Sequence, residues 1–333
     1  MIFCKLPFMN TNICDNIIVK NESPHIPFIS ETLNCYINKL YSCIQYNAFE
    51  IINQKQFSYL YTTPPSYYCN VPVIVAPCIF FTFVEIYRHP QLSYLLNTPI
   101  CNRHHITPYT NGAPDALTWV RRNFCNDIVN ISPVNIVKNN NDYVTKYTDD
   151  CKSTVDLITC DIDSPTINVL LQQIAFGLFI QKKGGSFIIK LAETYTKHIL
   201  DIIVILMNLY SSVIIINTDT CEDLVIEHYL ICVKFNGSSE KINSLFYNVL
   251  LDTKSALELT IKIPHIIINK IENFNSIVGQ NKLFLMNNII NRGNSEIKKT
   301  DVYKTDKTDE DKNIKKCVAW CDKHYMTCNA IYK

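Results

Sequence analysis

The chain has 333 residues, of which 47% are hydrophobic, and a formal net charge of +1. This length and composition suffice for a sizeable core in one large domain or two smaller ones. A net charge near zero excludes a global attraction to nucleic acid, so any such binding site must be local. The N-terminus lacks the basic region and apolar core of a secretory signal, so the 15 cysteines indicate reduced, largely buried thiols.

The sequence also bears on localisation. Residues 73–84 form an apolar run too short to cross a bilayer, and Asp201 and Asn208 interrupt a later run. The richness in Ile, Asn, Lys and Tyr is typical of an AT-rich coding genome, such as a viral one. We therefore expect a protein of the cytoplasm or nucleus of an infected host cell, not a secreted or membrane protein.

The N-terminal third gives several local predictions. Residues 1–27 show no periodicity and predict an arm or peripheral strands. Apolar residues at helix-like spacing predict one or two helices within 30–54. A buried strand is expected at 71–76, followed by an apolar helix over 79–87.

A segment rich in Pro, Asn and His, residues 90–114, predicts a long loop. His104 and His105 lie in it without a cysteine or acidic residue at a recognisable metal-site spacing, so a pair of loop histidines is favoured over metal ligands. A short helix over 115–123 and one or two strands within 128–137 follow.

The most informative part of the chain is a strand, a helix and a strand, predicted at 155–160, 166–181 and 186–191. This order implies a crossover connection between parallel strands. Asp161 directly follows the first strand, and Lys190 lies at the end of the second. Ligands of open α/β sheets bind at the carboxyl ends of strands, so both residues are candidates for one site.

Alternation continues with a helix over 195–210 and strands over 212–217 and 228–235. Too few residues join these two strands for a crossover helix, so they should be antiparallel neighbours. The predicted fold is therefore α/β, with a mainly parallel sheet, a C-terminal antiparallel hairpin and helices on both faces.

The C-terminal tail carries three cysteines and a histidine: Cys317, Cys321, His324 and Cys328. On a helix they would form one stripe about 16 Å long, which cannot converge on a single ion. We therefore predict no metal site there, but an amphipathic helix with buried thiols.

These observations divide the chain into five regions. They are an N-terminal helical and irregular region (1–70), an α/β core (71–240), a helical extension (241–296), a charged linker (297–316) and a terminal helix (317–333).

Three segments of the chain, DLITCDIDSP, KKGGSFIIKL and EHYLICVKF, resemble motifs of the FtsJ-like RNA ribose 2′-O-methyltransferases, particularly the viral and eukaryotic cap-methylating branch. The resemblance implies a Rossmann-like methyltransferase sheet, S-adenosylmethionine as cofactor, and RNA, in particular capped mRNA, as partner. It assigns catalytic roles to Asp161, Lys190 and Glu227. The residue types suit that chemistry, because a lysine held by carboxylates can orient a ribose hydroxyl and favour its deprotonation.

The same resemblance implies a cofactor loop where the chain reads Ala-Pro-Cys-Ile-Phe from Ala76. The family has two glycines at the third and fourth positions, so the loop is degenerate here, and isoleucine is a poor substitute for glycine. Cofactor-binding roles fall to Ala76, Pro77, Cys78 and Asp142.

A further catalytic lysine of the family corresponds to Lys55, with Lys39 as a second candidate. Three hypotheses stay open. The chain is an active RNA 2′-O-methyltransferase with a degenerate cofactor loop, an inactive descendant that serves as an RNA-binding or scaffolding subunit, or an unrelated α/β protein.

Overall fold

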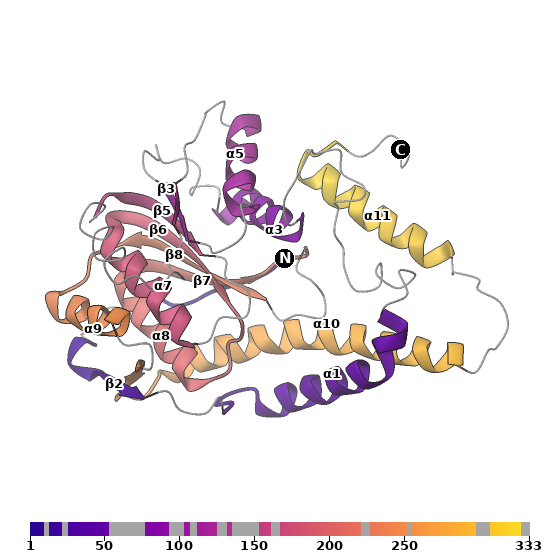
Figure 1. Ribbon diagram of the computed structural model, residues 1–333, viewed down its shortest axis with the longest axis horizontal. Helices are drawn as coiled ribbons and strands as arrows, with labels where there is room; N and C mark the ends of the chain where they lie inside the picture. The colour runs from indigo at the N-terminus through magenta and orange to yellow at the C-terminus, as the bar shows by residue number, and fades with distance from the viewer. Residues whose placement is uncertain are drawn as a thin grey trace.

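A computed structural model describes residues 1–9, 13–21, 26–52, 77–92, 103–106, 112–124, 132–134, 153–160, 167–220, 227–251, 255–297 and 307–327. Within them, a seven-stranded sheet has the order β1-β7-β8-β6-β5-β3-β4, and β2 and β9 form a separate pair. Helices cover both faces of the large sheet (Figure 1). The α/β class is therefore confirmed.

The strands are β1 (Ile2–Lys5), β2 (Ile17–Asn21), β3 (Arg103–Ile106), β4 (Ser132–Val134), β5 (Val155–Cys160), β6 (Gln181–Leu191), β7 (Tyr210–Asn217), β8 (His228–Phe235) and β9 (Ser255–Leu259). The helices are α1 (Glu31–Ile52), α3 (Pro77–Arg88), α5 (Gly112–Phe124), α7 (Ile167–Ile180), α8 (Lys197–Leu209), α9 (Glu240–Leu251), α10 (His265–Ile297) and α11 (Lys307–Lys323).

The large sheet is mixed, and the expectation of a mainly parallel sheet is wrong. The pairs β3–β4, β3–β5 and β5–β6 are parallel. The pairs β6–β8, β7–β8 and β1–β7 are antiparallel. The predicted antiparallel hairpin of β7 and β8 is confirmed. Two further antiparallel pairs arise because β8 lies between β7 and β6, and because β1, from the N-terminal region without periodicity, adds an edge strand to β7.

The crossover β5–α7–β6 has its predicted parallel strands. However, β6 begins at Gln181, so the glycines expected to end the preceding helix lie inside the strand. Gly184 has φ +88°, and a Cβ on Gly185 would lie 2.9 Å from the Asp156 carbonyl oxygen. The register between β5 and β6 shifts beside them. The glycine pair thus allows an irregular strand start where β5 approaches closely.

Two apolar layers flank the sheet, because side chains alternate between its faces. Ile189 and Leu191 of β6 belong to the layer that includes α7, α8, α9 and α10. Ile188 belongs to the opposite layer, which includes α3, α5 and α11. Figure 1 shows α3 and α5 on one side of the sheet and α7 and α8 on the other.

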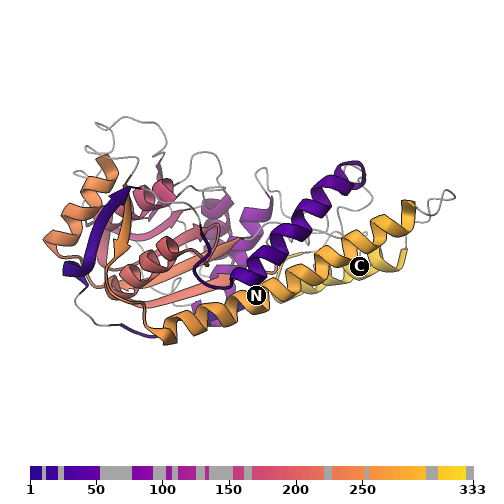
Figure 2. The same cartoon turned by 90° about the horizontal axis from the view of Figure 1, so that it is seen from below.

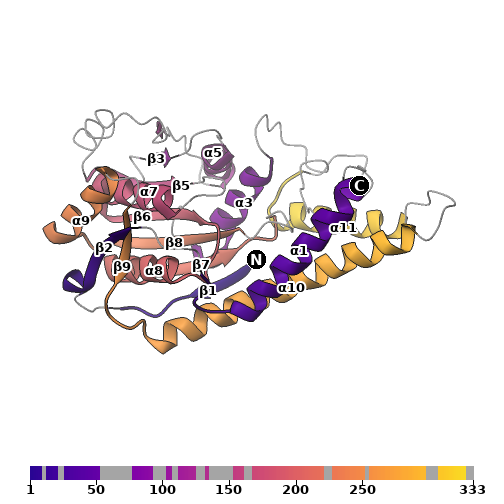
Figure 3. The same cartoon turned by 60° about the horizontal axis from the view of Figure 1, so that its bottom comes forward.

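The long helix α10 runs past the end of the sheet, with α1 beside it (Figures 2 and 3). A small apolar cluster joins the two helices through Ile37, Ile44 and Met286. Gly279 lies at their contact, where an added Cβ would be 2.6 Å from Cδ2 of Leu33. The glycine therefore allows α1 and α10 to approach each other closely.

At the C-terminus, α11 begins at Lys307, inside the segment expected to be a linker, and ends at Lys323. Lysine and glutamate are good helix formers, so a charged sequence can extend a helix whose other end is anchored. The anchor includes Trp320, whose ring makes an edge contact with Phe81 of α3 at 5.6 Å. Cys317 and Cys321 are fully buried on α11, as the amphipathic pattern predicts. Cys328 lies outside the described residues.

His104 and His105 lie in β3, not in a loop. Pairing with β5 and β4 outweighs the Pro- and Asn-rich flanks, because strand formation depends strongly on neighbouring strands. Within the described part of the chain, no cluster of His, Cys, Asp and Glu is arranged to hold a metal ion. Likewise, none of the described helices combines the length and apolar character needed to span a membrane.

Candidate functional site

Lys190 and Glu227 form an ion pair at one edge of the sheet. Lys190 is the penultimate residue of β6, and Glu227 directly precedes β8. The antiparallel register places Lys190 opposite Tyr229 and Leu191 opposite His228, which brings Glu227 beside the lysine. The Lys190 Nζ lies 2.8 Å from Oε1 of Glu227. The predicted strand end placed Lys190 at this edge, and the family resemblance added Glu227 to the same site.

The Lys190 side chain is almost fully buried, with 5% of its surface exposed, whereas that of Glu227 is 19% exposed. Alternation along β6 directs Lys190 to the face that carries Ile188 and Tyr229. Tyr229 is fully buried, and its ring makes an edge contact with Phe83 of α3 at 5.5 Å. An ammonium group in such apolar surroundings needs a carboxylate partner. The glutamate meets this need and leaves one side of the pair open to solvent.

Asn217, at the end of β7, supports the backbone of this site. Its Nδ2 donates a hydrogen bond of 2.9 Å to the carbonyl oxygen of Glu227. Asn217 is itself paired with Ile2 of β1. Three neighbouring strands, β6, β8 and β7, therefore contribute residues to the same edge.

A second polar group at this end of β7 centres on Glu85 of α3, which is 1% exposed. Its carboxylate accepts the backbone N–H of Asp219 at 3.0 and 3.2 Å and the hydroxyl of Thr220 at 3.2 Å. Burial, and next the charge of Asp219, raise the pKa of Glu85 to about 7. The group fastens α3 to the segment after β7. Sequence reasoning missed Glu85, because its only signal was a lone acidic residue in an apolar helix.

Several predicted site residues lie outside the described residues: Lys55, Ala76, Asp142 and Asp161. The structure therefore brings together Lys190 and Glu227 and leaves the position of Asp161 relative to them as a prediction. Lys39 is described, on an exposed face of α1.

The expected cofactor loop is described from Pro77 onward, where α3 begins. Cys78 and Ile79 thus lie in the first turn, in which backbone N–H groups lack intrahelical acceptors and can bind a carboxylate. Ile79 is half-buried and packs against the apolar layer on this face of the sheet. The backbone N–H groups of Cys78 and Ile79 are thus the donors that this helix start presents.

No protein-family model matches the sequence, and a search of curated proteins finds no significant match.

Proposed function

We propose that the protein is an S-adenosylmethionine-dependent RNA ribose 2′-O-methyltransferase that acts on mRNA caps in the cytoplasm or nucleus of an infected cell. The observation that carries the proposal is the ion pair of Lys190 and Glu227, held at the ends of adjacent strands with the ammonium group buried. The proposal includes a Rossmann-like methyltransferase arrangement of the sheet, with its cofactor at the start of α3.

Lys190 performs the central task in this reaction. A ribose 2′-hydroxyl is a weak nucleophile because its pKa lies far above neutrality. The ammonium group of Lys190 orients the hydroxyl oxygen and stabilises the negative charge that develops on it. Glu227 fixes the ammonium group and balances its charge, and Asp161 is proposed as the second carboxylate.

S-adenosylmethionine, when bound, supplies a methyl group on a sulfonium ion. The ribose oxygen would take this methyl carbon as its bond to sulfur breaks, and the hydroxyl proton would pass to solvent from the oxygen held by Lys190. At the start of α3, the backbone N–H of Cys78 would hold the amino acid end of the cofactor, and Pro77, which has no N–H, would line it together with Ala76 and Asp142. Lys55 is the proposed second lysine.

A second candidate function is that of an inactive relative which binds RNA or acts as a scaffold. The sequence from Ala76 to Phe80 favours it, since it lacks both glycines of the family's cofactor loop. Glycine permits close backbone approach to a ligand, which Cys78 and Ile79 restrict.

The test has two arms on the full chain. Calorimetric titration with S-adenosylmethionine measures binding, and transfer of a labelled methyl group is measured on capped RNA with ribose or 2′-deoxyribose next to the cap. The proposal predicts cofactor binding and labelling of the ribose substrate alone. Retention of RNA without any cofactor binding would identify the inactive relative, and labelling of both substrates would show that the ribose hydroxyl next to the cap is not the required acceptor.

A further inference from the structure

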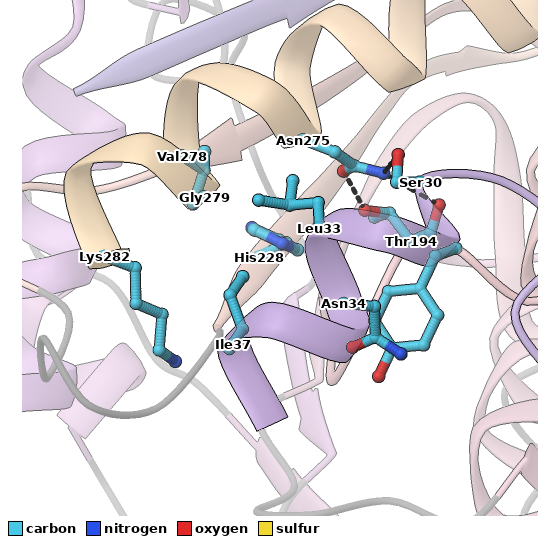
Figure 4. A pocket seen from close by; sticks show the side chains of 11 residues that line it. Ser30, Leu33, Asn34, Ile37, Thr194, His228, Asn275, Val278, Gly279 and Lys282 are labelled. Carbon is cyan, nitrogen blue, oxygen red and sulfur yellow. Dashed lines mark hydrogen bonds between the residues drawn. The ribbon is translucent and has the colours of Figure 1, made fainter. Parts of the chain in front are cut away.

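One side of the long helix α10 is occupied by other elements of the chain. Val278 and Gly279 line a pocket together with Leu33 and Ile37 of α1 (Figure 4). Met286 packs against α1 in the small apolar cluster described above. Figure 2 shows α10 along the lower edge of the molecule and α1 on one side of it. The residues on the opposite side of α10 are exposed.

Three large apolar side chains lie on this exposed side of α10. Ile266, Ile277 and Phe284 are 57%, 52% and 71% exposed. They are separated by 11 and 7 residues, close to whole numbers of helical turns, so they lie in one row along the helix, about 27 Å long. Exposed apolar side chains that are gathered in this way, and not scattered singly, are typical of an interaction surface.

The residues between these three complete the spacing of a coiled coil. Steps of four and three residues alternate along the row, and all its positions are exposed: Ile266, Lys270, Asn273, Ile277, Gln280 and Phe284. We call these six residues the exposed stripe. The alternation is that of positions a and d of a heptad, which are the positions that contact a partner helix. The exposed stripe therefore has the spacing needed to pack against another helix.

The charges along the exposed stripe favour a second copy of this chain as the partner. Lys270 is the only charged residue among the six, and its Nζ donates a hydrogen bond of 3.2 Å to the backbone carbonyl oxygen of Lys5 in β1. On the described part of α10, the exposed residues beside the stripe are uncharged: Asn269, Ser276, Asn281 and Asn287. Coiled-coil partners of different sequence are commonly selected by opposite charges beside the seam. Two copies of this surface meet without such selection and without a row of like charges.

We propose that the exposed stripe binds the same stripe of a second copy of this chain, with the two α10 helices antiparallel. In an antiparallel pair, each a position lies opposite a d position of the other helix. The register with the most apolar contact places three pairs opposite each other: Ile266 with Phe284, Asn273 with Ile277, and Lys270 with Gln280. Apolar residues then meet at both ends of the contact, and the amide oxygen of Gln280 can accept a hydrogen bond from the ammonium group of Lys270.

A parallel pair of α10 helices fits less well. It would place Lys270 of one copy opposite Lys270 of the other, because a positions then meet a positions and d positions meet d positions. The antiparallel arrangement avoids this repulsion. Since α10 runs past the end of the sheet (Figure 3), the antiparallel arrangement also places the two α/β cores at opposite ends of the helix pair. Half of the stripe is polar, so the dimer belongs to the weak and reversible class of complexes.

The first test is sedimentation velocity of the full chain at loading concentrations from about 1 to 100 µM, the range in which weak complexes form. The unmodified chain should pass reversibly from monomer to dimer. Phe284→Lys and Ile277→Lys should each raise the dissociation constant at least about tenfold, because each puts charges into the apolar contact. Tyr247→Lys is the matched control, since Tyr247 is an exposed aromatic residue of α9, and it should change the constant less than about twofold. A chain that stays monomeric throughout, or a dimer that neither stripe variant weakens, would overturn the proposal.

A charge pair then tests the antiparallel register. Ile266→Glu and Phe284→Lys should each weaken the dimer, whereas the double variant should associate at least about fivefold more tightly than either single variant. The reason is that the new carboxylate of one copy then lies opposite the new ammonium group of the other, twice in each dimer. In a parallel pair, like charges would meet at both positions. A double variant that associates no more tightly than the single variants would overturn the antiparallel register.

Discussion

At the scale of single residues, the burial of Lys190 has a structural cost, and its chemical role is the one proposed above. Its ammonium group is buried beside a fully buried tyrosine and is balanced by Glu227 at 2.8 Å. A buried ion pair contributes little net stability compared with apolar residues of similar size, but loss of one partner leaves the other charge uncompensated. The pair is therefore better explained by chemistry at the sheet edge than by stability.

Removal of either partner should destabilise the fold. We expect Lys190→Met and Glu227→Gln each to lower the free energy of unfolding by about 2–4 kcal/mol. The double variant Lys190→Met/Glu227→Leu should lose clearly less than the sum of the two single effects, because the cost of breaking this ion pair is then counted once and not twice. Urea unfolding at pH 7 measures these values.

The control for this cycle is the ion pair of Lys182 and Asp156, whose charged atoms are 3.3 Å apart. This pair joins β6 to β5. The Lys182 side chain is 57% exposed, so Lys182→Met should cost no more than about 1 kcal/mol. If Lys190→Met and Lys182→Met lowered the free energy of unfolding equally, burial would not explain the cost of losing the Lys190 charge.

Glu85 should make stability depend on pH. Its folded-state pKa is raised to about 7 from an ordinary value of 4.5, so the folded protein binds the proton more tightly than the unfolded chain. The resulting stabilisation is fully present below pH 4.5 and is lost as the pH rises through about 7. Its full size is about 3 kcal/mol.

Glu85→Gln should remove this dependence, since the amide keeps an acceptor for the Asp219 N–H but does not titrate. Urea unfolding between about pH 5 and pH 8 should give a flatter stability profile for this variant than for the unmodified chain. Glu31→Gln, at an exposed position of α1, should leave the profile unchanged. An unaltered slope in Glu85→Gln would assign the titration to other groups.

At the scale of elements, sequence periodicity predicted the long and strongly apolar segments well. The bounds of β5 and β8 agree with the structure, and those of α7 differ by one residue at each end. It failed for β3, and for β1 it gave only the alternative of peripheral strands within residues 1–27, without bounds; both strands have 4 residues. Such short strands exist because longer neighbours pair with them, and a local pattern cannot contain that information. The start of β6 was missed for a related reason. Glycines commonly end helices, but Gly184 and Gly185 lie within the strand and allow its irregular start.

The contact between α1 and α10 depends on the absence of a side chain at Gly279. Gly279→Ala should place a Cβ against Leu33, force the helices apart and destabilise the fold by about 1–3 kcal/mol. Leu33→Ala in the same chain should recover part of this loss, because it removes the atoms that the new Cβ meets. Thermal unfolding measures both effects.

Ser276→Ala is the matched control for this prediction, since Ser276 is exposed on α10 three residues earlier. Alanine has the higher helix propensity, so this variant should be neutral or slightly stabilising. A stabilising effect of Gly279→Ala similar to that of the control would show that the helices do not depend on close approach at the glycine.

At the scale of the whole molecule, the fold class followed from alternating strand and helix patterns, but the mixed character of the sheet did not. The N-terminal strand β1 joins β7, more than 200 residues later in the chain, in an antiparallel pair. The candidate site was accessible to sequence reasoning where it uses strand ends, as with Lys190 and Glu227. Glu85 was not accessible to sequence reasoning, because its significance comes from burial and from neighbours on distant elements.

The central claim is that Lys190 acts directly on the ribose hydroxyl in methyl transfer. The most direct measurement is the rate of label transfer from S-adenosylmethionine to capped RNA by Lys190→Met and by the control Lys182→Met, with cofactor affinity determined for both. The proposed function predicts that Lys190→Met loses about 10²-fold or more in rate while it still binds the cofactor, and that Lys182→Met stays within about twofold of the unmodified chain. A folded Lys190→Met protein that transfers methyl groups at the unmodified rate would contradict the claim.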